Sequence, residues 1–471
     1  MLHSTSSEHF ADRSVVEGLI FKMMDTIQQQ DPPQHEYLFA QLKEPPRSQP
    51  QLDAKVVCTE VHGSGECLDT SVISSMELNG GRDFLAVGDR GGKITVYREE
   101  YVNKRSKFIE YLVFQSHDPE FDYLKSLEIE EKINQIKWVP RSYHDRFLLS
   151  ANDKTVKLWR VGEMASRSVE NLNDVNNPNH LALPRVKFGT SRPVACFRRA
   201  YANAHAYHIN SISVNTDQET FLTSDDLRIN LWNLERNKES FLAVDMKPEN
   251  MEDLTEVITS SVFHPTQCNV FAYSSSKGIT RMCDMRVSAV CDNKNSKVFQ
   301  DIPANRGYFS EVISSICSLQ FSNSGRYLAT RDFMMVKIWD LTMERTPVQI
   351  IPVHEHLHCK LGDLYENDSI FDKFSVSWSD RDDYISTGSY DGLVCLAQRN
   401  STRSSIYAIS RDVSKNQVLK PKTVVSGPAE KRHSVSVEAL DLDRKVGLTQ
   451  WGSDNLLLAA ANSSMYVLTV K

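Results

Sequence analysis

The sequence predicts an all-β fold, a seven-bladed WD-repeat β-propeller with long inter-strand insertions and an N-terminal extension. A pattern of two apolar strands joined by a short polar turn recurs seven times along the 471 residues. The second strand ends in tryptophan at Trp159, Trp232 and Trp339, and Trp339-Asp340 is the dipeptide typical of WD repeats. A lone strand pair cannot bury both of its faces, so repeated units are expected to stack around an axis.

Each copy has the chemistry of a β-hairpin, because β-branched and aromatic residues flank Gly, Asp, Asn or Ser at the turn. The copies span residues 84–97, 147–159, 221–232, 270–285, 327–340, 384–397 and 456–468. Their second strands end about 52 to 73 residues apart, whereas a bare WD-type blade needs roughly 40–45 residues. Each blade should therefore carry insertions. Residues 54–61 alternate as a strand does, and we expect them to close the ring as the outer strand of the last blade.

The propeller is expected to occupy residues 51–471, after an extension formed by residues 1–50. Apolar residues in the extension lie at helical spacing, which predicts a short amphipathic helix followed by a proline-containing linker. Two more segments fall outside the repeat. Residues 162–197 are interpreted as an insertion after the second blade, and residues 400–436 as a long polar loop before the last one.

Composition excludes several classes of protein. Apolar residues make up 40% and charged residues 24% of the chain, which is typical of a soluble globular protein. The net charge of −7 argues against a dedicated nucleic-acid binder. No apolar run reaches the roughly 18 residues of a membrane span, and no basic region of a signal peptide precedes the first apolar stretch. Nine cysteines without a CxxC pair argue against a disulfide framework. We therefore expect a cytoplasmic, or also nuclear, protein with no membrane or nucleic-acid partner.

Motifs of catalysis are missing from the sequence. It contains no Walker A, GxSxG or HExxH pattern, and the GDRGG segment at residues 88–92 has the glycines of a hairpin turn. One cluster raises the alternative of a metal-dependent enzyme. On an extended strand His354, His356 and His358 would share a face, where three imidazoles could hold Zn²⁺. A polar, solvated loop is the favoured interpretation of this cluster, so we expect no enzymatic activity, no cofactor and no metal.

Two acidic segments, residues 118–131 and 245–257, predict a negatively charged surface. In the second segment four carboxylates are spaced to share one face of a short helix: Glu249, Glu252, Asp253 and Glu256. An acidic surface attracts basic peptide segments and speeds their encounter. A solvated charged face is the commoner meaning of such a run, and it remains the alternative.

The hairpin turns are expected to project from one face of the ring, because they all join equivalent strands. Most of their aspartates are explained by side-chain bonds that cap the turn itself. The adjacent pair Asp225-Asp226 is harder to explain, since one turn needs one carboxylate and two neighbouring ones repel each other. A basic ligand would relieve this repulsion.

Two longer segments resemble a known family. Residues 120–134 (EFDYLKSLEIEEKIN) and 203–217 (NAHAYHINSISVNTD) are similar to the signature segments of the B-type, 55-kilodalton regulatory subunit of protein phosphatase 2A. Residues 251–258, 274–286 and 364–374 are also similar to segments of this family. The resemblance implies a non-catalytic propeller that binds a HEAT-repeat scaffold subunit and lies beside the catalytic subunit. Its acidic top face would recruit phosphoserine and phosphothreonine proteins that carry basic segments.

The resemblance also implies site residues. The substrate face would consist of Asp226, Leu254, Phe121, His208, Tyr365, Glu366, Asp368, Lys373 and, in the GDRGG turn, Arg90. Asp226, Glu366 and Asp368 would pair with lysines or arginines of a substrate, while Leu254 and Phe121 would supply an apolar anchor. Residues 162–197 would form the arm that grips the scaffold, with contacts from Leu181, Leu183, Pro184, Val186 and Phe188. The alternative, a propeller adaptor of some other assembly, has the same fold.

Overall fold

The computed structural model describes a defined set of residues, and all structural statements below concern them. They are residues 56–62, 69–102, 105–123, 126–140, 146–170, 185–291, 296–301, 307–399, 401, 404–409, 417–419, 421–422, 442, 444–452 and 455–470. The predicted extension of residues 1–50 lies outside this set, and so do Leu181, Leu183 and Pro184.

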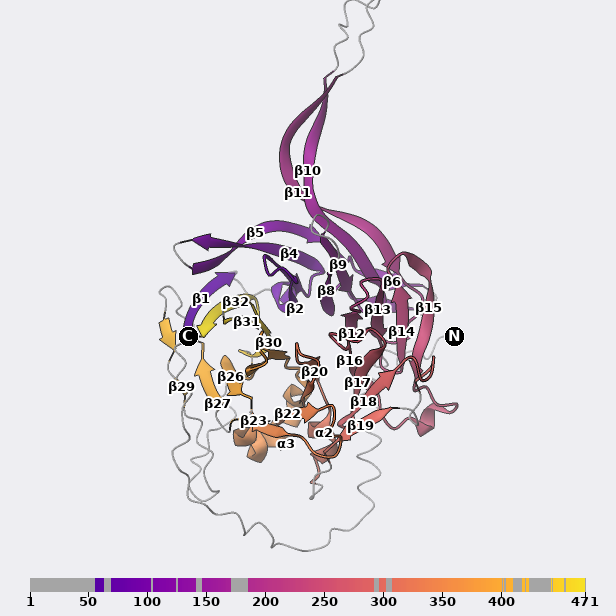
Figure 1. Ribbon diagram of the computed structural model, residues 1–471, viewed down its shortest axis with the longest axis vertical. Coiled ribbons are helices and arrows are strands. Elements are labelled where there is room, and N and C mark those ends of the chain that lie inside the picture. Colours follow the sequence, from indigo (N-terminus) through magenta and orange to yellow (C-terminus); the bar gives the residue numbers. More distant parts are fainter. Residues whose placement is uncertain are drawn as a thin grey trace, which may run out of the picture.

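Seven antiparallel sheets form the blades of a ring, with the first strand of each blade nearest the centre (Figure 1). Blade 1 contains β2 (Ile73–Leu78), β3 (Phe84–Asp89), β4 (Lys93–Val102) and β5 (Arg105–Gln115). Blade 2 contains β8 (Gln135–Val139), β9 (Arg146–Ala151), β10 (Val156–Glu170) and β11 (Arg185–Tyr201). Blade 3 contains β12 (Ser211–Val214), β13 (Thr220–Ser224), β14 (Arg228–Asn233) and β15 (Arg236–Asp245). Blade 4 contains β16 (Ile258–Phe263), β17 (Val270–Ser275), β18 (Ile279–Asp284) and β19 (Lys297–Gln300).

The remaining blades follow the same plan. Blade 5 contains β20 (Ser318–Phe321), β21 (Tyr327–Arg331), β22 (Met335–Asp340) and β23 (Gln349–Pro352). Blade 6 contains β24 (Val376–Trp378), β25 (Tyr384–Gly388), β26 (Leu393–Gln398), β27 (Ser404–Ala408) and β29 (Pro421–Lys422). Blade 7 contains β30 (Val446–Trp451), β31 (Leu456–Ala461), β32 (Ser464–Val470), β1 (Val56–His62) and β28 (Gln417–Leu419). Each of the seven predicted hairpins is confirmed as the second and third strand of a blade.

Side chains near the axis join several neighbouring blades. The Ser75 hydroxyl of β2 accepts a hydrogen bond from the backbone N–H of Ile136 in β8, at 2.9 Å. Ser211 of β12 accepts in the same way from β16, at 2.9 Å, and Ser375 accepts from β30, at 2.7 Å. The innermost strand of a blade is a sheet edge, so these hydroxyls satisfy backbone donors that would otherwise be buried without a partner.

The ring closes through the predicted strand. β1 pairs with β32 in an antiparallel register that runs from Val56–Val470 to His62–Met465, which confirms that the N-terminal strand belongs to the last blade. On the inner side, the Gln450 side chain of blade 7 accepts a hydrogen bond from the backbone N–H of Leu78 in blade 1, at 3.0 Å. Closure removes the free sheet edge that an open ring would leave.

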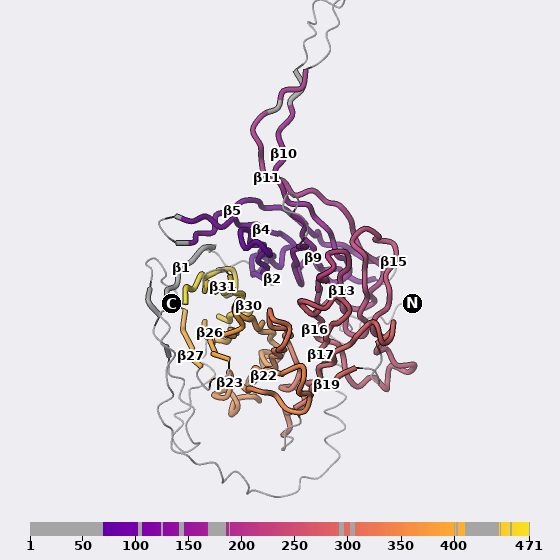
Figure 2. The backbone as a smooth tube through the Cα atoms, viewed as in Figure 1, coloured from indigo at the N-terminus to yellow at the C-terminus, as the bar shows by residue number. Residues whose placement is uncertain are grey.

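The insertion predicted after blade 2 lies instead within blade 2. β10 and β11 continue the third and fourth strands of that blade, and their pairing extends to Glu170–Arg185. β9 pairs with β10 only as far as Val161, so the two longer strands project from the ring as a free hairpin (Figures 1 and 2). The sequence predicts an insertion outside the repeat because the outer part of the hairpin is exposed on both faces and lacks apolar alternation.

Two other elements differ from the predictions. The acidic helix of residues 245–257 is only a 3-10 turn, η2 (Met251–Asp253), in which Asn250 accepts a hydrogen bond from the backbone N–H of Glu252. Glu256 lies beyond η2 and pairs with Arg281 at 2.8 Å, so the four carboxylates do not share a helix face. Within the predicted loop 400–436, the described parts form β27, β28 and β29. No helix in the described ranges is long and apolar enough to span a bilayer.

Candidate functional site

A cavity of about 980 Å³ lies on the axis of the ring and is lined by residues of all seven blades. The β3–β4 and β13–β14 turns reach the same end of it as the segments that precede β12 and β24, because the strands of each blade are antiparallel. Four predicted substrate-face residues line this cavity: Arg90, His208, Asp226 and Lys373. The fold therefore brings together residues that are up to 283 positions apart in the sequence.

The two adjacent aspartates have different environments. Asp225 is completely buried and caps its own turn, accepting hydrogen bonds from the backbone N–H groups of Leu227 and Arg228 at 2.8 and 2.6 Å. Its second oxygen contacts Nδ1 of His205 at 2.9 Å. Burial alone would raise the pKa of Asp225, but the interactions with His205 and the two N–H groups outweigh it and lower the pKa below the ordinary value.

A buried chain of polar groups continues from this aspartate into blade 3. Nε2 of His205 lies 2.6 Å from the Thr223 hydroxyl, and Nε1 of Trp232 donates to the same hydroxyl at 2.9 Å. The tryptophan that ends the repeated strand is thereby tied to the turn at the strand's other end. Asp225 is thus a structural residue of the blade.

Asp226 lines the cavity instead. Its carboxylate accepts a hydrogen bond from the side-chain amide of Asn210 at 2.9 Å. Burial raises the pKa of Asp226, while Asn210 and the positive charge of Lys373 act in the opposite direction and Asp225 adds to the rise. Burial disfavours the charged form of this carboxylate, so a cation that enters the cavity would stabilise it.

Residues that the sequence analysis did not select complete this part of the cavity. Asn134 donates to Asp153 at 2.8 Å and to the backbone oxygen of Ile209 at 3.0 Å, as Asn210 does to Asp226 and Ile258 in the next blade. Asp153 also contacts Nδ1 of His208 at 3.0 Å. The signal for these residues is the Ile-Asn pair, which recurs at positions 133–134 and 209–210, just before the first strands of blades 2 and 3.

The other predicted substrate-face residues do not line the cavity. Phe121 lies in β6 (Glu120–Asp122), which pairs with β7 (Leu127–Ile129), and its ring is 45% exposed and packs edge-on against Tyr123 at 5.1 Å. Leu254 ends η2, one residue before the cavity-lining Thr255. Tyr365 and Glu366 end α3 (Leu361–Glu366), and Asp368 precedes η4 (Ser369–Phe371) with a φ of 56°.

The hairpin of β10 and β11 carries the part of the predicted scaffold set that the structure describes. Val186 lies in β11 and is half-exposed, and Met164 of β10 is exposed to a similar extent. Phe188 belongs to β11 by its backbone. The hairpin thus presents apolar side chains to solvent beyond the edge of the ring.

The geometry behind the zinc hypothesis is not present. Residues Glu355–Lys360 form a 3-10 helix, η3, and not an extended strand, so alternate residues do not share a face. His354 precedes η3, is fully buried and has its Nε2 at 2.9 Å from the Ser389 hydroxyl. Among the described residues, no group of three histidine, cysteine or acidic side chains is placed to hold a metal ion.

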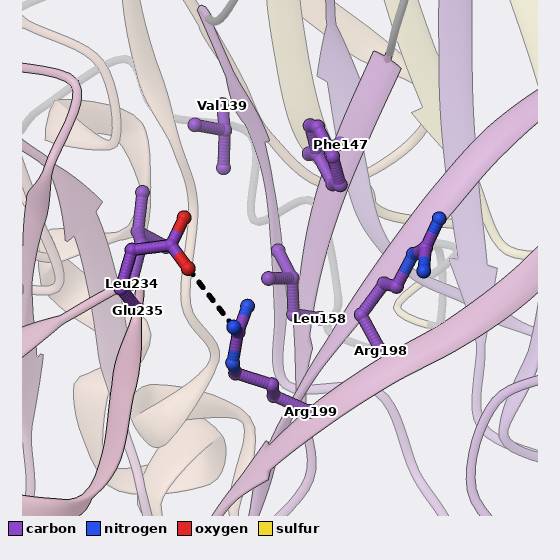
Figure 3. Close-up of a pocket in the computed structure, with 7 residues that line it drawn as sticks. All are labelled: Val139, Phe147, Leu158, Arg198, Arg199, Leu234 and Glu235. Atoms are coloured by element: carbon purple, nitrogen blue, oxygen red, sulfur yellow. Dashed lines mark hydrogen bonds and ion pairs between the residues drawn. The ribbon is translucent and has the colours of Figure 1, made fainter.

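A second, smaller cavity of about 290 Å³ lies between blades 2 and 3 (Figure 3). Its apolar lining comes from Val139, Phe147, Leu158 and Leu234. The guanidinium of Arg199 reaches Glu235 at 2.9 Å, while Arg198 points away from that pair. The ion pair connects β11 to the segment after β14, so the cavity belongs to the junction between the blades.

Comparisons with known proteins agree with the fold and add a family. The model of the WD domain, G-beta repeat, matches residues 367–396, which include β24 and β25. A Drosophila melanogaster protein named protein phosphatase PP2A 55 kDa regulatory subunit is 48% identical over 420 residues, covering 86% of this chain and 84% of its own. A Carassius auratus protein, named as the B beta isoform of the serine/threonine-protein phosphatase 2A 55 kDa regulatory subunit, is 48% identical over 422 residues, covering 86% of this chain and 95% of its own.

Proposed function

Because the chain belongs to the 55 kDa regulatory subunits of protein phosphatase 2A, we propose that it recruits phosphoprotein substrates at the central cavity and binds the scaffold subunit through the hairpin of β10 and β11. As a regulatory subunit it is not the catalytic enzyme. Its task in this proposal is to hold a phosphoprotein so that the catalytic subunit hydrolyses the phosphoserine or phosphothreonine ester.

The observation that carries the substrate proposal is the position of Asp226. Its neighbour Asp225 fulfils every structural need of the turn, so Asp226 is left to face the cavity. A lysine or arginine of a bound segment would neutralise it, and desolvation in the cavity would strengthen that pair relative to one at an open surface. The exposed rings of Phe121 and Tyr123 offer an apolar contact outside the cavity.

The test is the charge reversal Asp226→Lys in the assembled heterotrimer. We expect kcat/KM for a basic phosphoprotein to fall by about tenfold or more, as for a lost charge pair of roughly 1.4 kcal/mol. Assembly with the scaffold and catalytic subunits should be unchanged, because the substitution lies inside the ring. Glu239→Lys, on the exposed outer strand β15, is the control with the same change of net charge. Loss of assembly in Asp226→Lys, or an equal loss of activity in the control, would contradict the assigned surface.

A further inference from the structure

The central cavity also carries basic residues. The proposed pairing of Asp226 with lysines or arginines of a substrate does not explain them. Arg90 follows β3 in blade 1, Lys132 precedes β8 in blade 2, and Lys373 precedes β24 in blade 6. All three side chains line the same cavity as Asp226. Three cations from three blades therefore line one cavity, with Lys132 half-buried and Arg90 and Lys373 exposed.

These cations form no direct ion pair with the described carboxylates around them, although the charge of Lys373 acts on Asp226 and those of Asp153 and Glu130 act on Lys132. Asp153 is engaged by His208 and Asn134, Asp226 by Asn210, and Asp372 by Lys445 and Tyr390. In the described part of the chain, none of the three cations forms a side-chain hydrogen bond or an ion pair. The aspartates at this end of the cavity thus have polar partners, whereas Arg90, Lys132 and Lys373 do not.

The positive charges act on one another. Burial lowers the pKa of Lys132, and the charges of Lys373 and Arg90 lower it further, whereas Asp153 and Glu130 offset only part of the effect. Like charges that are only partly offset by nearby carboxylates raise the free energy of the unbound protein. An anion that binds between them would relieve this repulsion.

We propose that Arg90, Lys132 and Lys373 form a receptor for a second phosphate group on the recruited protein, distinct from the phosphate that is hydrolysed. A phosphorylated serine or threonine carries about −1.5 to −2 charges at pH 7 and three acceptor oxygens, which suits three cations better than a carboxylate does. The arginine fork and the lysine point charges are the usual protein ligands of phosphate.

The inference rests on the proposed function, because the phosphate arrives on the segment whose basic residues face Asp226. A segment with both lysines or arginines and one phosphate would match both sides of the cavity. Recruitment would then depend on prior phosphorylation of the substrate outside the hydrolysed position.

The test measures binding of the purified full chain, without the catalytic subunit, to linker histone in unmodified and thiophosphorylated form. The thiophosphate resists hydrolysis, and in the absence of the catalytic subunit no phosphatase active site competes for it. We expect thiophosphorylation to tighten binding about tenfold, the equivalent of roughly 1.4 kcal/mol for charge-assisted contacts. The variant Lys132→Gln should lose most of this gain and keep its affinity for unmodified histone, because Lys132 does not belong to the predicted substrate face.

The control is Lys107→Gln, which removes an exposed lysine from the outer strand β5. It should keep the gain. A gain that persists in Lys132→Gln, or that falls equally in Lys132→Gln and Lys107→Gln, would overturn the phosphate receptor. If unmodified histone fails to bind and Asp226→Lys leaves kcat/KM unchanged, the proposed recruitment is wrong. The anion site is then tested by the next measurement alone.

That measurement needs no variant. In the wild-type chain, the rate at which an amine-reactive ester acylates each lysine is followed by mass spectrometry in millimolar inorganic phosphate and in chloride of equal ionic strength. Phosphate should slow the acylation of Lys132 and Lys373 relative to chloride and leave Lys107 unaffected. Equal rates in the two salts would refute the site.

Discussion

At the scale of the residue, one step along the backbone separates a structural carboxylate from a functional one. Asp225 points into blade 3 and bonds to His205 and two backbone N–H groups, while Asp226 lines the central cavity. Successive side chains in an extended turn point in opposite directions, so adjacent identical residues meet different environments. The repulsion expected between the two is reduced because each has its own hydrogen-bond donors.

This difference predicts that alanine destabilises the protein much more at position 225 than at position 226. Asp225→Ala leaves His205 and the turn N–H groups without their acceptor, and we expect it to lower the free energy of unfolding by about 3 kcal/mol, at roughly 1 kcal/mol for each buried bond. Asp226→Ala should cost less than about 1 kcal/mol, because Asn210 keeps its bond to Ile258. Urea unfolding of the two variants checks this. A similar loss in both would contradict the division of roles.

A buried histidine gives a second prediction, for the dependence of stability on pH. Burial lowers the pKa of His354 well below the ordinary value, and the charge of the buried Arg331 guanidinium adds to this effect. The unfolded chain therefore binds a proton that the folded chain does not, and the free energy of unfolding falls as the pH drops below about 6.5, by up to 1.4 kcal/mol per unit.

His354→Gln should remove this contribution and flatten the slope between pH 6.5 and 5, measured by urea unfolding at each pH. His117 contributes with the same sign, because burial and Lys157 lower its pKa to about 3, so the variant keeps part of the slope. A slope identical to that of the wild type would mean that His354 is protonated in the folded chain.

Single residues could be predicted from the sequence where their pattern was unusual. They could not be predicted where their role depended on the three-dimensional position of other residues. The Asp225-Asp226 pair stood out as one carboxylate too many, and Asp226 does face the cavity. Lys132 did not stand out, because a lysine in an acidic segment resembles a solvated residue until the ring places it near Arg90 and Lys373. The zinc hypothesis for His354, His356 and His358 was wrong because it required an extended strand. Residues Glu355–Lys360 form a 3-10 helix instead.

At the scale of the element, the outer part of the β10–β11 hairpin makes no pairing with the other described strands of blade 2. Beyond Val161, β10 pairs with β11 alone. The nine residues of β10 from Gly162 to Glu170 extend it by about 30 Å, at roughly 3.3 Å per residue. Two-stranded ribbons of this kind are marginal by themselves, so exposed Met164 and Val186 gain from a partner that covers them.

Deletion of residues 164–195 with a short turn in their place should therefore abolish or strongly weaken binding to the phosphatase scaffold subunit. The propeller should stay folded, with an unfolding midpoint close to that of the wild type, because the pairing of β9 with β10 is retained. Surface-immobilised scaffold and the full chain give the affinity. Unchanged scaffold affinity in a folded deletion variant would show that the contact lies elsewhere on the ring.

The elements that could be predicted are those whose burial leaves a periodic apolar pattern. The second and third strands of the blades are sandwiched between neighbouring blades, and β17 and β31 are buried at every position. The outer part of β10 and the strand β27 have mixed or polar sequences because one or both faces meet solvent. Periodicity cannot distinguish such strands from loops. This explains why the sequence predicts an insertion outside the repeat for residues 162–197 and a loop for residues 400–436.

At the scale of the whole molecule, closure of the ring determines stability. Hydrogen bonds near the axis join blade 1 to blade 2 and blade 6 to blade 7, and blade 7 is completed by β1 from the other end of the described chain. A ring without this strand would expose the edge of β32 and lose the covalent link between its first and last blades. The central cavity, which depends on all seven blades, would lose its fixed geometry.

A chain that lacks residues 1–63 tests this dependence. The register of β1 with β32 contains six residue pairs, so at roughly 0.5–1 kcal/mol for each backbone bond the free energy of unfolding should fall by about 3 to 6 kcal/mol. The matched control lacks residues 1–50 and retains β1. Urea unfolding gives the stabilities, and histone binding reports whether the cavity survives. If the shorter chain matched its control in stability and in histone binding, β1 would not be needed to close the ring. The contact between blades 7 and 1 at Gln450 and Leu78 would then suffice.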